Sequence, residues 1–132
     1  MRDTNVLAMR EDMELTLPPR PDSVAEARHA SARLLNGLSD RSRSGALLIV
    51  SELVTNAIKH GPDAPVHLRM RRRDGTVRGE VTDQGEGAIE VGRTVEPGSG
   101  GFGLRLVDAF SDRWGVDPAG PRVWFELRDR PD

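Results

Sequence analysis

Hydrophobic positions along the chain follow two periods, and these separate predicted strands from predicted helices. Alternation of apolar and polar residues predicts strands at residues 13–17, 66–72, 76–82, 114–117 and 122–128. Apolar residues spaced three and four apart predict helices at residues 23–35, 46–60 and 103–110. This order of elements favours an α+β fold, in which a mixed, mostly antiparallel sheet carries helices on one face. We therefore expect a two-layer α/β sandwich.

Cap and turn residues give the expected limits of these elements. Ser23 and Glu26 form a capping-box pattern at the start of the first helix. Residues 39–45 are polar and are predicted to connect the first two helices. The Asp74-Gly75 pair is typical of a tight turn and predicts a hairpin between the second and third strands.

Composition narrows the function classes. The 132 residues suit one domain, expected at 13–128 between a flexible tail at 1–12 and a charged tail at 129–132. Lys and Arg total 19 against 21 Asp and Glu, so the net charge of −2 lacks the basic excess of a nucleic-acid-binding protein. Cysteine is absent, which excludes disulfides and thiol catalysis. No apolar run reaches the roughly 20 residues of a membrane span, and no signal peptide is visible, so a cytoplasmic protein is expected.

The predicted helix at residues 46–60 carries polar residues on the side away from its core-facing stripe. Glu52, Asn56 and Lys59 are spaced i, i+4 and i+7, which places them on one face. A solvated surface is the plainer interpretation, but Leu48 and Ile49 lie on the same side, so we expect another element to cover part of it. A carboxamide oxygen suits Mg²⁺, and a carboxylate one turn earlier could orient or deprotonate a hydroxyl beside the metal.

A glycine-rich segment follows the third predicted strand directly. It reads Asp83-Gln-Gly85-Glu-Gly87. A carboxylate at a strand end can accept a hydrogen bond from the exocyclic amine of a base, and the glycines allow a flat ring to approach the backbone. A simple turn is the alternative interpretation of the same residues.

A second glycine-rich segment opens the third predicted helix and contains Gly98, Gly100, Gly101, Gly103 and Leu104. Its G-x-G-x-x-G spacing matches a Rossmann fingerprint, but that motif must follow a buried strand within a βαβ unit, which this order of elements lacks. Free amides at a helix N-terminus nevertheless bind anions. The segment is therefore a candidate phosphate cradle.

The order of the three segments resembles the N, G1 and G2 boxes of the Bergerat-type ATP-binding domain of gyrase, histidine kinases and MutL, the GHKL superfamily. The sequence is more similar still to anti-sigma-factor-type Ser/Thr protein kinases of actinomycetes, over about residues 15–127. The segments that carry this second resemblance are Ser51-Glu-Leu-Val-Thr-Asn56, Gly103-Leu-Arg-Leu-Val-Asp108, Asp112-Arg-Trp-Gly115 and Val123-Trp-Phe-Glu-Leu127.

The resemblance implies ATP and Mg²⁺ as cofactors. It implies that Asn56 holds Mg²⁺, that Asp83 binds the adenine amino group and that Lys59 meets phosphate charge. It further implies that Glu52 acts as general base and that Arg28 contacts a partner. The glycines implied to lie near the nucleotide are Gly85 and Gly87 at the base, and Gly98, Gly100, Gly101 and Gly103, followed by Leu104, at the phosphates.

The function implied by the resemblance is that of a regulatory kinase. Such a kinase phosphorylates an anti-anti-sigma protein of the STAS type, sequesters a sigma factor and forms a symmetric homodimer. The alternative is an ATP-binding clamp that holds its regulator without phosphorylating it, and only Glu52 favours the kinase over the clamp. A detached ATPase of the gyrase or MutL kind is disfavoured, because the chain is too short for a transducer domain.

Overall fold

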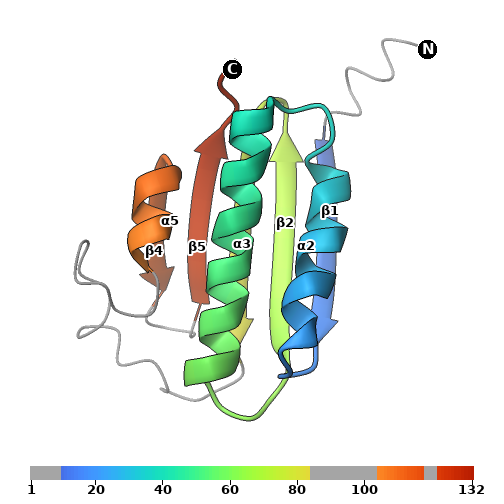
Figure 1. Ribbon diagram of the computed structural model, residues 1–132, viewed down its shortest axis with the longest axis vertical. Coiled ribbons are helices and arrows are strands. Elements are labelled where there is room, and N and C mark those ends of the chain that lie inside the picture. Colours follow the sequence, from blue (N-terminus) through green and yellow to red (C-terminus); the bar gives the residue numbers. More distant parts are fainter. Residues whose placement is uncertain (1–9, 84–103, 118–121) are drawn as a thin grey trace.

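Three helices lie on one face of a five-stranded sheet in the computed structural model, which describes residues 10–83, 104–117 and 122–132 (Figure 1). The elements in chain order are β1 (Arg10–Leu17), α2 (Asp22–Leu34), α3 (Asp40–His60), β2 (Val66–Arg73), β3 (Thr76–Asp83), α5 (Leu104–Phe110), β4 (Arg113–Asp117) and β5 (Arg122–Arg128). None of the helices in these described ranges combines the length and the apolar character needed to cross a membrane.

The sheet has the strand order β1-β2-β3-β5-β4, and every neighbouring pair is antiparallel. The predicted α+β, two-layer fold with helices on one face is therefore confirmed. The described strands contain no parallel pair, so this part of the sheet is antiparallel rather than mixed.

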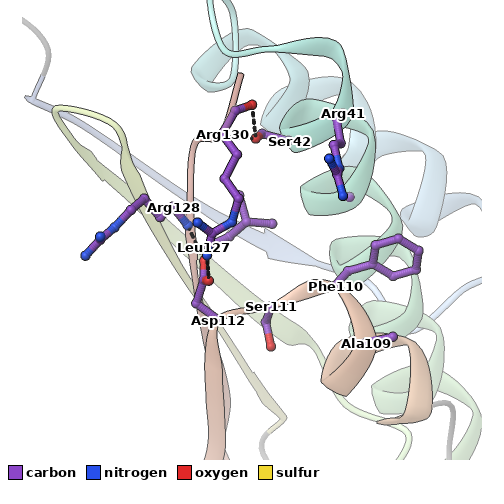
Figure 2. Close-up of a pocket in the computed structure, with 10 residues that line it drawn as sticks. Arg41, Ser42, Ala109, Phe110, Ser111, Asp112, Leu127, Arg128 and Arg130 are labelled. Atoms are coloured by element: carbon purple, nitrogen blue, oxygen red, sulfur yellow. Dashed lines mark hydrogen bonds and ion pairs between the residues drawn. The ribbon is translucent and has the colours of Figure 1, made fainter. Parts of the chain in front are cut away.

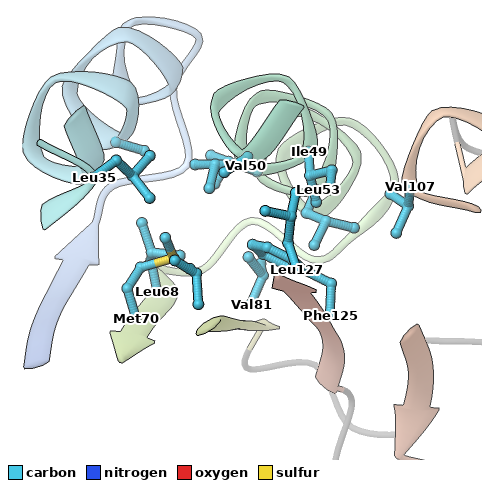
Figure 3. Packing of buried hydrophobic residues seen from close by; sticks show 14 of the residues in the cluster. Leu35, Ile49, Val50, Leu53, Leu68, Met70, Val81, Val107, Phe125 and Leu127 are labelled. Atoms are coloured by element: carbon cyan, nitrogen blue, oxygen red, sulfur yellow. The ribbon is translucent and has the colours of Figure 1, made fainter. Parts of the chain in front are cut away.

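The core lies between the sheet and the helices and is mainly aliphatic. Figure 3 shows Leu35 and Val50 on the helical side above Leu68 and Met70 of β2, and all four side chains are fully buried. Phe125 of β5 is the largest fully buried side chain among the described residues. Its ring lies against the backbone of Gly79 in the neighbouring strand β3, where any Cβ would overlap the ring.

The opposite face of the sheet is polar and is not covered by any described element. Arginines on β2, β3, β4 and β5 alternate there with carboxylates of neighbouring strands. The half-buried Trp124 lies beneath Arg78, whose Cζ is 4.5 Å from the ring centroid. This face is called the open sheet face below.

β1 begins at Arg10, three residues before the predicted start. β2 extends to Arg73 and pairs with β1 along its whole length. The added cross-strand pairs are charged, and the Oδ1 atom of Asp12 lies 3.1 Å from Nη1 of Arg73. This hydrogen bond lowers the pKa of the Asp12 carboxyl below its ordinary value. Residues 10–12 of the predicted tail thus belong to the sheet, and their charged pairing is invisible to a search for apolar alternation.

α3 begins at Asp40, so the predicted polar connector before residue 46 is wrong. The hydroxyl of Ser39 caps the helix by accepting a hydrogen bond from the amide of Ser42 at 3.1 Å. The carboxylate of Asp132 accepts from the amides of Asp40 and Arg41 at 3.1 and 2.9 Å. First-turn amides need such acceptors, and their presence explains why a polar segment is helical.

Residues 129–132 pack against this helix start rather than leaving the domain as a separate tail. The carboxylate of Asp129 accepts a hydrogen bond from the amide of Ser39 at 3.1 Å. Burial alone would raise the pKa of Asp129, but hydrogen bonds from Ser39 and Ser42 and the charge of Arg72 lower it on balance. The ionised form is therefore the one that suits this position.

α2 begins at Asp22, and the predicted cap at Ser23 is wrong. Pro21 occupies the N-cap position and makes no side-chain cap. The hydroxyl of Ser23 instead donates to the carbonyl of Pro18 at 2.6 Å. The capping-box pattern predicts that the Ser23 hydroxyl accepts a hydrogen bond from a helix amide. In the structure the nearby carbonyl of Pro18 takes that hydroxyl as a donor instead.

Candidate functional site

The second half of α3 presents the polar stripe expected from the sequence. Leu53, Val54 and Ala57 of this helix are buried against the sheet. Glu52 and Asn56, one turn apart on another side, are half-buried, and Lys59 is exposed in the last turn. Burial of the apolar stripe therefore sets the direction of the acid and the amide, whereas the lysine is free to extend towards a ligand.

α5 covers part of the same side of α3, as the apolar residues on it predict. Ile49 is fully buried, and Figure 3 shows it on the side of α3 that faces Val107 of α5. Leu104, the first residue of α5, is also buried. This predicted site residue therefore packs in the core, where it anchors the start of α5 beside α3.

The side-chain amide of Asn56 has an unsatisfied atom. Its Nδ2 is buried and has no hydrogen-bond partner among the described residues. Buried polar groups are nearly always paired in native proteins, so this atom marks a position that a ligand can satisfy. A half-turn of the carboxamide exchanges nitrogen for oxygen, and an oxygen at this position fits the ligand preference of Mg²⁺.

Asp83 lies beside the end of α3. It is the last residue of β3, is 6 % exposed and pairs in the sheet with Val66 of β2. A Cβ built on Gly61 would lie 3.1 Å from Oδ2 of Asp83 and would overlap the carbonyl oxygen of Ala57. The absence of a side chain at Gly61 therefore lets the helix end and the carboxylate approach each other.

Gly61 is a site residue that inference from the sequence did not single out. It closes α3 as its C-cap, and its amide donates to the carbonyl of Ala57 at 3.0 Å. A glycine directly after a helix is a common C-terminal signal, so the sequence pattern shows only that role. The approach of Asp83 adds a second requirement for glycine at this position.

The other predicted site residues are placed as follows. Arg28 is exposed on α2, a different helix from the one that carries the acid and the amide. Six predicted nucleotide-binding glycines lie outside the described residues: Gly85, Gly87, Gly98, Gly100, Gly101 and Gly103. The described structure thus brings together the end of α3 and Asp83.

Comparison with protein families gives a match to the histidine kinase-like ATPase domain over residues 17–127. The matched region runs from the last residue of β1 almost to the end of β5, so it includes both the helix stripe and Asp83. No curated protein sequence matches the chain.

A solved structure with a similar fold is the crystal structure of the RsbU and RsbW domains of Rv1364c from Mycobacterium tuberculosis. The superposition has a TM-score of 0.66 and covers 91 % of this chain at 19 % sequence identity. The aligned part is 32 % of the mycobacterial chain, so the present chain spans about a third of that protein's crystallised length. At this identity the likeness establishes a shared fold.

Proposed function

Because the chain belongs to the histidine kinase-like ATPase domain family, we propose that this ATP-binding domain is a regulatory kinase that transfers phosphate from Mg²⁺·ATP to a Ser or Thr hydroxyl of a partner protein. The observation that carries the proposal is the placement of a buried carboxylate, Asp83, beside the helix end that follows Asn56, whose buried amide nitrogen is unsatisfied. The carboxylate of Asp83 can accept a hydrogen bond from a base, and the carboxamide of Asn56 can bind a metal ion. The two groups therefore suit the two different contacts that the proposal assigns to them.

Each described residue has a separate task in this proposal. The carboxylate of Asp83 accepts the hydrogen bond of the adenine amine, and its burial makes that bond selective. Asn56 is the residue that would hold Mg²⁺, which supplies charge neutralisation for the phosphates. Lys59 is exposed in the last turn of α3 and extends to the phosphates. The glycines from Gly98 to Gly103 are assigned to the same phosphates from the sequence resemblance.

Substitution of Asp83 by asparagine tests the base-binding assignment. Asparagine can still turn its carbonyl oxygen towards the adenine amine, but it loses the negative charge that strengthens this hydrogen bond. Hydrogen bonds to charged groups contribute about 1.5–3 kcal/mol and neutral ones about 0.5–1.5 kcal/mol, so we expect ATP to bind roughly tenfold more weakly by titration calorimetry. Asp74→Asn, at the exposed β2–β3 turn where the backbone is left-handed, is the matched control with unchanged affinity. Equal affinity of the unmodified protein for ATP and GTP would contradict the assignment.

The proposed partners are an anti-anti-sigma protein of the STAS type as phosphate acceptor and a sigma factor as the sequestered protein. This proposal rests on the sequence resemblance, and the fold shared with a structure that contains an RsbW domain agrees with it. Arg28 is available for partner contact because it is exposed on α2. The alternative, a clamp that binds ATP and its regulator without phosphate transfer, uses the same residues except Glu52.

We also propose that the chain forms a symmetric homodimer. The open sheet face supports this proposal, because none of the described elements covers it and it includes the half-buried Trp124. Multi-angle light scattering should therefore report twice the 14.5 kDa chain mass. A monomer at high protein concentration, both with and without nucleotide, would remove the proposal.

A further inference from the structure

A pocket of about 350 Å³ lies at the N-terminal end of α3 (Figure 2). The first turns of α3, the last turn of α5 and the end of β5 enclose it. At 1.5 Å per helical residue, its floor at Gly45 is about 24 Å from Gly61 along the helix axis. The pocket is therefore separate from the candidate ATP site, and it is called the α3 pocket below.

The floor of the α3 pocket is a glycine that neither the backbone nor the packing requires. A Cβ on Gly45 would lie 3.6 Å from Cδ1 of Phe110 and 3.7 Å from Cδ1 of Leu127, which are ordinary van der Waals distances. Alanine would thus fit, and it would stabilise the helix interior relative to glycine. A residue that destabilises its own helix, although neither packing nor backbone conformation requires it, is typical of a functional position. Gly45 is itself buried, and Phe110 and Leu127 lie within contact distance of the position that a Cβ would take, so a longer side chain here would extend into the pocket.

One wall of the α3 pocket is apolar, and the rest of its lining is polar or charged. Phe110 is 47 % exposed and is the only large hydrophobic side chain among the described residues to be exposed. It ends α5 and stands beside Ala109, which is also exposed, while Leu127 closes the opposite wall. An exposed apolar surface of this kind, set in a concave site, favours an apolar side chain as occupant.

The rim of the α3 pocket is positively charged. Arg41 is exposed and forms no ion pair within the described part of the chain. Arg130 pairs with the single carboxylate of the rim, that of Asp112. Arg128 also lines the pocket, but Figure 2 shows its guanidinium pointing away. The rim therefore carries one guanidinium that makes no ion pair among the described residues.

We propose that the α3 pocket docks a segment of a partner protein that packs one apolar side chain against the exposed ring of Phe110 and pairs an adjacent carboxylate with Arg41. The helix start already binds a carboxylate of its own chain, because the amides of Asp40 and Arg41 donate to Asp132. Those amides are occupied, so the guanidinium of Arg41 is the group that remains for an incoming acid. This docking site goes beyond the proposed kinase function and makes no use of nucleotide.

The test is a titration of the ¹⁵N-labelled full chain with the synthetic peptide acetyl-Ser-Asp-Leu-Asp-Ser-amide, followed by NMR. We expect saturable shifts of the amides of Gly45, Phe110 and Leu127, with that of Asp83 unchanged. A peptide with serine in place of leucine, and another with lysines in place of both aspartates, should each bind at least tenfold more weakly. Absence of saturable shifts up to about 5 mM peptide, a concentration that detects millimolar affinity, would overturn the proposal.

Variants of the protein separate the floor from the rim. Gly45→Leu fills the pocket and should weaken peptide binding at least tenfold, whereas Ser44→Leu, at the exposed neighbouring position, should leave it unchanged. If Gly45→Leu does not fold by circular dichroism, Arg41→Glu remains decisive, because an acid in the first turn of α3 suits the helix dipole. It should weaken binding at least tenfold, while Arg33→Glu, exposed on α2, should not.

Two results with these variants would overturn the proposal. One is unchanged peptide affinity in a folded Gly45→Leu or Arg41→Glu variant. The other is a set of shifts at Gly45 that depends on protein concentration without peptide, because a second copy of the chain would then occupy the pocket.

Discussion

Substitution of Glu52 by glutamine is expected to slow phosphate transfer to a partner hydroxyl by about 10²–10⁴-fold, the usual contribution of a general base. Glu52 is half-buried on α3, one turn before Asn56, so its carboxylate lies on the side of the helix that holds the proposed metal ligand. In the proposed reaction, the proton of the attacking hydroxyl would pass to this carboxylate while the γ-phosphoryl group moves to the hydroxyl oxygen and ADP leaves. At 1.36 kcal/mol per decade, the expected rise in the activation barrier is roughly 3–5 kcal/mol.

Glutamine keeps the shape of the side chain and removes only the base, so ATP binding and partner binding should stay close to normal. Asn56→Ala should in addition weaken Mg²⁺-dependent nucleotide binding, since it removes the proposed metal ligand. The assay is radiolabel transfer from ATP to a candidate STAS protein, with a pull-down of the same pair. Glu26→Gln, exposed on α2, is the matched control.

The outcomes of this experiment separate the kinase from the clamp. Transfer at the unmodified rate by Glu52→Gln would show that the base is wrongly assigned, although the kinase proposal would stand. No transfer by the unmodified protein to any STAS or sigma partner that it binds would instead favour the clamp. Phosphoryl transfer depends mostly on positioning and electrostatics, so the Asn56→Ala variant provides an independent measure of the nucleotide site.

Substitution of Arg72 by methionine is expected to lower the free energy of unfolding by about 2–4 kcal/mol, because it leaves two carbonyls at the end of α2 unsatisfied. Arg72 is 6 % exposed on the core face of β2. Its Nη1 atom donates to the carbonyl of Leu34 at 2.9 Å and to that of Asn36 at 2.6 Å. It therefore satisfies two carbonyls at the C-terminal end of α2, where the helix offers no donor.

Methionine fills much of the same volume but leaves both carbonyls without this donor, and an unsatisfied buried acceptor costs about 1–3 kcal/mol. Urea denaturation measures the loss. Arg69→Met is the matched control, because Arg69 lies on the open sheet face of the same strand and pairs with Glu14 at 3.5 Å. Exposed ion pairs of that kind contribute about 0–1 kcal/mol. Equal stability losses for the two variants would contradict the role assigned to Arg72.

Local sequence patterns predicted much of the fold. Apolar alternation and helical spacing are properties of consecutive residues, so they located the five strands and three helices and indicated one helix-covered face of the sheet. The same patterns placed Glu52 and Asn56 on one side of a helix and Asp83 at a strand end. Ile49 on that side led to the expectation of a covering element, and α5 meets it.

The cap predicted at Ser23 failed because of a carbonyl five residues away, but the wrong limits of α3 and β1 depend on partners distant in the chain. α3 begins at Asp40 because Asp132, 92 residues later, accepts its first amide hydrogen bond. β1 begins early because its charged residues pair across to β2. A polar segment with no apolar period looks like a connector until such partners are known.

The sequence by itself determined which residues alternate, which share a helix face and which chemical groups the candidate nucleotide site contains, because these follow from chain periodicity and residue type. Only the tertiary structure decided that Gly61 lies against the carboxylate of Asp83, that Arg72 donates to a carbonyl at the end of α2, and that Gly45 lines a pocket. Each of these depends on a distance between segments that the chain brings together only when the helices pack on the sheet. The residue type of a glycine or an arginine does not show which distant residue will contact it. That contact forms only when the core packs.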